Sequence, residues 1–257
     1  MHFTMLLIAA CAYSIRARGI FCLFYLLLSG LAHGQTLPGL QPFSSASDGA
    51  PPPPWRVVGL PNGKAPLSQL DIVPLDGLQV LRLRTDRSYG TLSHPLASLT
   101  APGVLRWRWR LDQPMPAANL LRKEGDDAPL KVCAMFDLPL DNIAFVERNL
   151  LRLARRISGE YLPGATLCYV WDHTLPTGTE LANAYTRRVR FVVVDSASQA
   201  LGQWVHHRQD LSADFLRAFG TETDTVPPLL AIVVGADSDN TGSTSLGYIG
   251  DLSLMKQ

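Results

Sequence analysis

The residues best suited to bind a metal ion lie in the segment Asp237-Ser238-Asp239-Asn240-Thr241-Gly242. This segment follows an apolar run over Leu229–Gly235, so a turn after a strand is expected. Oxygen-bearing side chains at alternate positions can converge on Ca²⁺, and glycine permits the tight turn. The twelfth position holds Tyr248 instead of Glu, so the pattern is not an EF-hand. The segment predicts either a calcium loop or a hairpin turn rich in Asp and Asn, and its candidate ligands are Asp237, Asp239, Asn240 and Thr241.

A second acidic cluster, Glu124-Gly125-Asp126-Asp127, precedes an expected strand over Lys131–Asp137. Neighbouring carboxylates could hold calcium, act as an acid and a base, or accept hydrogen bonds from sugar hydroxyls. A turn made of good turn residues with solvated charges is the simpler interpretation. Asp126 and Asp127 are therefore candidate ligand-binding residues only if other polar groups meet them.

The tryptophans are the third feature that could bind a ligand. Most of them share the strand alternation with Leu or Val, which favours core packing. Trp171-Asp172 closes an apolar strand and is the best candidate for a rim position, where an aromatic ring could stack on a sugar. Arg208, at the end of another expected strand, is a further candidate if it meets the acidic residues in one cleft.

The sequence lacks the motifs of several enzyme classes. It contains no GxSxG elbow, no HExxH motif, no phosphate-binding loop and no dinucleotide-binding glycine pattern. The net charge of +1 offers no broad basic field for nucleic acid.

These candidates must be positioned by strands. Strand-like runs recur at regular spacing, separated by Pro, Gly, Asp and Ser. They cover Trp55–Leu60, Leu78–Thr85, Gly103–Leu111, Leu130–Leu138, Ala165–Asp172, Arg187–Asp195, Gly202–Arg208, Leu229–Ala236 and Ser245–Leu254. In Leu105–Leu111 every second residue is apolar, which predicts one buried face and one face with three arginines. About nine strands without βαβ alternation predict a mainly β protein, a jelly-roll-like antiparallel β-sandwich.

Two segments predict helices within this sandwich. Asn142–Ser158 is amphipathic, and Gly159 is its expected end. Its apolar face carries Ile143, Val146, Leu150, Leu153, Ala154 and Ile157, and its other face carries Arg148, Arg152, Arg155 and Arg156. The basic face could bind a membrane or an acidic partner, although a solvated face is the simpler expectation. A short helix is expected over Ala213–Phe219, with Ser212 as N-cap and Gly220 as stop.

The first 34 residues predict a secretory signal peptide. Arg16 and Arg18 precede an apolar run over 20–28, and Ala32-His33-Gly34 forms a small-residue cleavage site. The run is too short for a comfortable membrane span, so contact with the membrane is expected only during export. The protein is therefore expected to be periplasmic or secreted.

Residues 35–54 are rich in small residues and proline and predict a linker, followed by one domain over 55–257. Without the signal, two cysteines remain, Cys133 and Cys168. They could pair in an oxidising compartment or remain buried thiols.

Several segments stand in a distinctive order and spacing: 80–96, 105–111, 125–127, 167–172, 201–220 and 236–242. Together they resemble a bacterial family of unknown function, the domain family numbered 3047, and the resemblance covers about Trp55 to Leu254. The chain departs from the family where Lys131 replaces the usual Arg, and where His207 replaces an acidic residue; these departures put a family salt bridge in question. Membership implies a secreted or periplasmic β-sandwich but no activity. The last strand also resembles that of jelly-roll carbohydrate-binding modules, which makes Asp251 a calcium-ligand candidate by analogy.

Three functions follow from these features. The first is a non-catalytic module that binds a glycan or another envelope polymer. The second is a hydrolase or lyase that acts on carbohydrate through its loop carboxylates. The third is a structural envelope protein whose polar residues brace loops.

Overall fold

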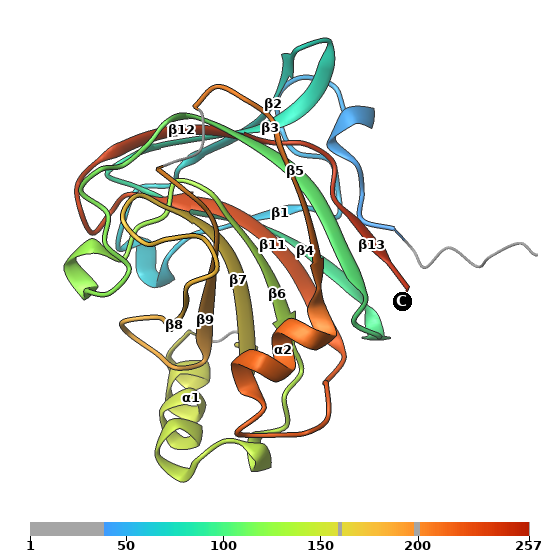
Figure 1. The fold of residues 1–257 in the computed structure, drawn as a ribbon, viewed down its shortest axis with the longest axis vertical. Coiled ribbons are helices and arrows are strands. Elements are labelled where there is room, and N and C mark those ends of the chain that lie inside the picture. The colour runs from blue at the N-terminus through green and yellow to red at the C-terminus, as the bar shows by residue number, and fades with distance from the viewer. Residues whose placement is uncertain (1–38, 159–160, 198–200, 257) are drawn as a thin grey trace, which may run out of the picture. The chain divides into compact units, whose positions relative to one another are not determined.

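The computed structural model describes residues 39–158, 161–197 and 201–256. They form two β-sheets packed face to face, which confirms the predicted mainly β sandwich (Figure 1). The larger sheet contains, in spatial order, β1 (Arg56–Val58), β4 (Tyr89–Thr100), β11 (Leu229–Asp237), β6 (Lys131–Phe136), β7 (Ala165–Asp172), β9 (Val189–Ser196) and β8 (Glu180–Ala182). The smaller sheet contains β10 (Val205–Asp210), β5 (Val104–Gln113), β12 (Thr244–Ile249), β3 (Leu78–Asp86) and β2 (Gln69–Leu75), and β13 (Ser253–Met255) pairs with β5. Among these strands the pairing is antiparallel, except that β7 and β9 run parallel.

The core between the sheets follows the predicted alternation. On β5 the apolar side chains face inward and are buried, and the arginines between them face outward. The indole of Trp109 is nevertheless paired, because its Nε1 donates to Asp195 Oδ2 at 2.6 Å. A buried polar atom on an aromatic ring is thus satisfied inside the sandwich.

The strand β7 is buried on both of its faces. Leu167, Tyr169 and Trp171 belong to the core between the sheets, whereas Cys168 and Val170 belong to a second apolar cluster on the other side of the larger sheet. The outer face of this sheet is therefore itself covered, and the cover is what creates a groove.

Three of the strands listed above were not predicted, namely β2, β4 and β8. Two of them, β2 and β4, contain Pro74 and Pro95, and proline within a run argues against a strand. Proline is tolerated on β2 because β2 is the edge of the smaller sheet. Pro95 lies opposite Ala231, where the register of β11 shifts, so the irregularity accommodates it.

The short helix α2 (Leu211–Phe219) confirms the second predicted helix with a different cap. Asp210, not Ser212, is the N-cap: its carboxylate accepts from the backbone N–H groups of Ser212 and Ala213. Leu211, Phe215 and Phe219 are buried in the core.

The longer helix α1 (Phe145–Ser158) is amphipathic as predicted, but its apolar row is exposed to solvent and does not pack into the core. Only Leu151 is buried among its residues, while Val146, Leu150, Leu153 and Ile157 are exposed. The predicted C-cap Gly159 lies outside the described residues. No helix in the described ranges is long and apolar enough to span a bilayer.

Residues 39–54, within the predicted linker, contact the sandwich. Leu40 and Phe43 are buried, and the Phe43 ring lies 5.0 Å from that of Trp55. Gly49 exchanges backbone hydrogen bonds with Ile72 of β2. Packing therefore begins before Trp55, while the predicted signal segment lies outside the described residues.

Candidate functional site

A groove of about 810 Å³ lies over the outer face of the larger sheet. Its floor is formed by four neighbouring strands through Val233, Cys133, Met135, Thr166, Cys168 and Phe191. Its walls come from residues in 120–128, from residues in 183–188 and from α1. These segments are distant in sequence, and the strand order β11-β6-β7-β9 brings them together. The volume falls within the roughly 300–1,000 Å³ range of ligand-binding pockets.

The two acidic clusters predicted from the sequence meet beside this groove. Carboxylate oxygens of Asp127, Asp237 and Asp239 lie within 4.8 Å of one another. Asp127 accepts hydrogen bonds from the backbone N–H groups of Asn240 and Thr241, at 3.2 and 2.7 Å, and from Thr241 Oγ1 at 2.6 Å. Asp127 therefore ties the two loops together. The four proposed calcium ligands, Asp237, Asp239, Asn240 and Thr241, follow one another in one of these two loops. Calcium binding there stays a prediction.

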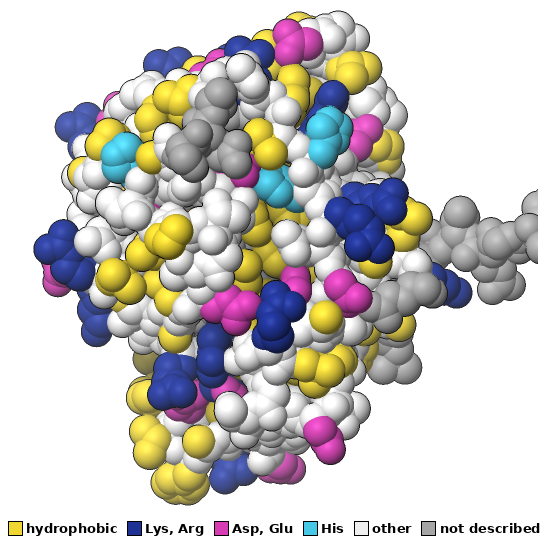
Figure 2. Space-filling view, viewed as in Figure 1, with side chains coloured by type: hydrophobic (Ala, Val, Ile, Leu, Met, Phe, Trp, Pro, Cys, Tyr) yellow, Lys and Arg dark blue, Asp and Glu magenta, His cyan; other side chains and the backbone are white. Residues whose placement is uncertain are grey.

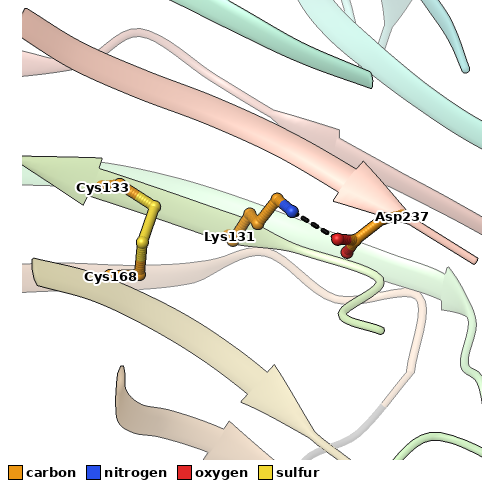
Figure 3. Close-up of a disulfide and its surroundings, with 4 residues drawn as sticks. All are labelled: Lys131, Cys133, Cys168 and Asp237. Carbon is orange, nitrogen blue, oxygen red and sulfur yellow. Dashed lines mark hydrogen bonds and ion pairs between the residues drawn. A yellow bond between two sulfur atoms is a disulfide. The ribbon is translucent and has the colours of Figure 1, made fainter. Parts of the chain in front are cut away.

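Asp237 is held by a buried ion pair that the acidic clusters alone did not reveal. Lys131 Nζ lies 2.6 Å from Asp237 Oδ2 (Figure 3). The same nitrogen lies 4.7 Å from the centre of the Tyr89 ring. The other oxygen of Asp237 accepts from the backbone N–H of Ala128 at 2.9 Å. Burial is the largest single influence on the pKa of Lys131 and would lower it, but the charge of and hydrogen bond to Asp237, together with Tyr89 and Asp126, outweigh burial, so the pKa is raised. Lys131 therefore stays charged in the wall of the groove.

Asp126 contacts a residue that the sequence analysis missed. Asn183 Nδ2 donates to Asp126 Oδ2 at 2.5 Å. The Asn183 carbonyl oxygen accepts from the backbone N–H groups of Tyr185 and Thr186, which fixes its amide group toward Asp126. The turn chemistry of Asn183 was readable from sequence, but nothing local indicated its partner, 57 residues away.

Tyr185 stands on the rim of the groove with an exposed ring. Its hydroxyl donates to the backbone oxygen of Lys123 at 3.1 Å, and Lys123 Nζ lies 5.3 Å from the ring centre. Asn240 Nδ2 donates to the same backbone oxygen at 2.8 Å. Tyr185 is therefore oriented while most of its ring remains available to a ligand.

The raised pKa of Asp126 predicts that the stability of the protein depends on pH. Burial raises its pKa from 3.8 to about 6, although the hydrogen bond from Asn183 opposes the rise. An acid whose pKa rises on folding holds its proton more tightly in the native state, so stability falls as pH rises from about 4 to about 6. Asp126→Asn removes this loss, and should be more stable than wild type by about 1–2 kcal/mol above pH 6.5, after allowance for partial solvent screening. The gain should vanish near pH 4.

Urea unfolding at several pH values measures this difference. The exposed Asp224→Asn is the matched control for replacing a carboxylate with an amide at the surface. A difference between Asp126→Asn and wild type that stays constant between pH 4.5 and 7 would contradict the assigned ionisation.

The groove floor contains a disulfide between Cys133 and Cys168, which settles the alternatives left open by the sequence (Figure 3). The two residues face each other directly on β6 and β7. Lys131 is two residues from Cys133 on the same strand, so both side chains lie on the groove side of the sheet. The disulfide therefore forms part of the surface that a ligand would contact.

Four proposed site residues lie outside this convergence. Trp171 is buried in the core, so it is not a rim residue. Asp172 accepts hydrogen bonds from the N–H groups of Thr174 and Leu175 and closes a turn. Arg208 and Asp251 line a different cavity, of about 560 Å³, on the outer face of the smaller sheet, and Asp251 accepts from the backbone N–H of Ser44 at 2.9 Å.

Both positions that depart from the pattern of family 3047 carry polar pairs. Lys131 pairs with Asp237, as described above. His207 Nε2 lies 3.0 Å from Asp195 Oδ2, the same oxygen that accepts from Trp109. Lys131 and His207 therefore each have a polar partner in this chain.

One protein-family model covers most of the chain. The model of a family described as "Protein of unknown function (DUF3047)" matches residues 53–253. A comparison with curated protein sequences gives no match.

Solved structures with a similar arrangement include TmCBM61 in complex with β-1,4-galactotriose, at 11% identity and a TM-score of 0.34 over 80% of this chain and 90% of that chain. The K1 cleaved adhesin domain of Lys-gingipain from Porphyromonas gingivalis W83 is 10% identical, with a TM-score of 0.38 over 85% and 98% of the two chains. The cellulose-induced protein Cip1 is 9% identical, with a TM-score of 0.32 over 79% and 91%. At such distances the likeness does not identify a ligand.

Proposed function

We propose that this chain, which belongs to the DUF3047 family of proteins of unknown function, is a non-catalytic binding protein. It holds a glycan in the groove of the larger sheet. The observation that carries the proposal is the hydrogen bond from Asn183 to Asp126. It holds two polar groups in a fixed orientation beside the apolar floor of the groove.

The chemistry of the groove suits a sugar chain. A sugar ring has apolar C–H faces and a belt of hydroxyl groups, so it needs an apolar surface and planar hydrogen-bonding groups at its edge. Cys133, Cys168 and Phe191 supply the apolar surface, and Asp126 and Asn183 supply the planar groups. The exposed ring of Tyr185 adds a surface on which a sugar could stack.

The positions and hydrogen bonds of the loop carboxylates favour binding over catalysis. Hydrolysis of a glycosidic bond needs two carboxyl groups on opposite sides of the cleft. Asp127 and Asp237 are neighbours, and their oxygens already accept bonds from Thr241, Lys131 and the backbone. Two of the loop carboxylates are thus engaged in bracing the groove wall.

Tyr185→Ala is expected to weaken glycan binding about tenfold, or about 1.4 kcal/mol. The change removes the exposed ring without touching the buried Lys131–Asp237 pair. A glycan array with the purified protein identifies the ligand, and isothermal titration calorimetry measures the affinity. Asn183→Ala should show a similar loss, because it removes both the amide and the group that orients Asp126.

Tyr248→Ala is the matched control, since Tyr248 lies on β12 of the smaller sheet and does not line the groove. Its affinity should equal that of wild type. Equal losses for Tyr248→Ala and Tyr185→Ala, or an array without any enriched glycan, would count against binding in the groove.

One observation favours a second candidate, a carbohydrate-active hydrolase or lyase. A carboxyl whose pKa is raised to about 6, as for Asp126, has the property of a general acid. Incubation of the bound glycan with the protein, followed by assays for new reducing ends and unsaturated sugars, separates the two functions. Release of product that Asp126→Asn abolishes would replace binding by catalysis as the proposed function.

We propose in addition that the protein is exported and acts in the periplasm or outside the cell. The signal-like segment over 1–34 supports this proposal, and so does the Cys133–Cys168 disulfide, because disulfides persist in oxidising compartments. Fractionation of cells that produce the tagged protein tests it, with recovery in the cytoplasm as the contrary result.

A further inference from the structure

The helix α1 presents a continuous apolar row to solvent. Val146, Leu150, Leu153 and Ile157 follow the spacing that places side chains on one helix face, and each is 54–67% exposed. Phe145, 70% exposed, begins the helix, and Figure 2 shows hydrophobic side chains gathered at the lower left, where Figure 1 places α1. Contiguous apolar patches of this kind mark interaction sites in soluble proteins.

Contacts made by other residues of α1 keep this row exposed, although Leu150 also borders the groove. Leu151 is 5% exposed and packs into the core. Glu147 pairs with Arg188 and, at 3.4 Å, with Arg187. Arg155 Nε donates to the backbone oxygen of Leu162 at 2.9 Å. Turning the apolar row toward the domain would break these contacts, so the exposure is built into the fold.

The surface beside the apolar row is basic. Arg152 and Arg156 are exposed and have no ion-pair partner among the residues that the structure describes. The single acidic side chain of the helix, Glu147, is already paired with Arg187 and Arg188. The outward side of α1 therefore combines apolar area with uncompensated positive charge.

We propose that α1 docks on a membrane surface that contains anionic lipid. An amphipathic helix with Lys or Arg beside a large apolar face lies in the interface plane of a bilayer, with its apolar side about 5–10 Å deep. Leu153 and Ile157 would enter the acyl boundary, and Arg152 and Arg156 would contact lipid phosphates. Phe145 at the start of the helix and Tyr161 just beyond its end, both exposed, would lie at headgroup level.

Charge argues against a second copy of the chain as the occupant. Two α1 helices packed through their apolar rows would bring Arg152 and Arg156 of one copy toward like charges on the other. An anionic bilayer satisfies both the apolar row and the arginines. Because α1 also forms one wall of the groove, docking would hold the groove next to the membrane.

Sedimentation with vesicles tests the proposal. The purified protein should bind vesicles of phosphatidylglycerol and phosphatidylethanolamine, and bind pure phosphatidylcholine vesicles at least tenfold more weakly. Leu153→Glu/Ile157→Glu should lower binding at least tenfold. Arg152→Gln/Arg156→Gln should remove the preference for anionic lipid and most of the dependence on salt. Neither pair of residues lines the groove, so glycan affinity in solution should stay at the wild-type value.

Leu67→Glu/Leu121→Glu is the matched control, because these leucines are 61% and 63% exposed on other segments. It should bind vesicles as wild type does. Equal binding to both lipid compositions would overturn the proposal. So would a lack of vesicle binding accompanied by a dimer that Leu153→Glu/Ile157→Glu dissociates, or by retention on polyglutamate, which would indicate an acidic protein partner. A loss of glycan binding alone would count against the groove and not against docking.

Discussion

Replacing Lys131 with Met is expected to lower the free energy of unfolding by about 3–5 kcal/mol, the cost of leaving a buried charge without its partner. Lys131 and Asp237 are both buried, and Nζ and Oδ2 are 2.6 Å apart. Met keeps the length and the apolar stem of Lys131, so the change isolates the loss of the ammonium group. Asp237 would keep only its bond from the Ala128 N–H.

Urea unfolding followed by circular dichroism measures the change. Lys64→Met, at an exposed position, is the matched control and should alter stability by less than about 0.5 kcal/mol. Asp237→Asn in the Lys131→Met background should recover part of the loss, because the unpaired carboxylate is neutralised while an acceptor for Ala128 remains. A cost of Lys131→Met within the range of the control would show that the pair does not stabilise the fold.

The strands that were predicted from sequence are those whose pattern is dictated by burial. On β5 the alternation of Leu and Trp with Arg follows directly from one buried and one exposed face. The observed bounds of β7 equal the predicted ones because both of its faces are buried and its ends are set by polar or turn residues. The strands β2 and β4 escaped prediction because their prolines are accommodated by an edge and by a register shift, which are properties of the assembled sheets.

The candidate site was predicted in part for a similar reason. Asp127 and Asp237 lie in turn-forming segments that the sequence marks clearly, and β11 pairs with β6, which brings these turns together. Lys131 begins an apolar strand, and its role depends on Asp237, 106 residues away. The outward row of α1 was equally hidden, because an apolar helix face is identical in sequence whether it is covered or exposed.

Removing the disulfide with Cys133→Ala/Cys168→Ala is expected to lower the free energy of unfolding by about 3–4 kcal/mol. The two cysteines are 35 residues apart, and the bond between them restricts the unfolded chain across the whole connection from β6 to β7. In the native state β6 and β7 are already paired in register along their length, so the sheet should persist without the disulfide. The loss should therefore come mainly from the unfolded state.

Because the loss should come mainly from the unfolded state, the double variant should be less stable but still bind its ligand. The near-ultraviolet circular dichroism of Cys133→Ala/Cys168→Ala should resemble that of wild type, and glycan affinity should fall by no more than a few fold, since the strands that form the groove floor remain paired. Wild-type protein treated with a reductant should unfold at the urea concentration of the double variant, and the reductant should not shift the variant itself. Equal stability of wild type with and without reductant would mean that the bond does not limit the unfolded chain. A large loss of affinity at unchanged stability would instead make the sulfur atoms part of the binding surface in their own right.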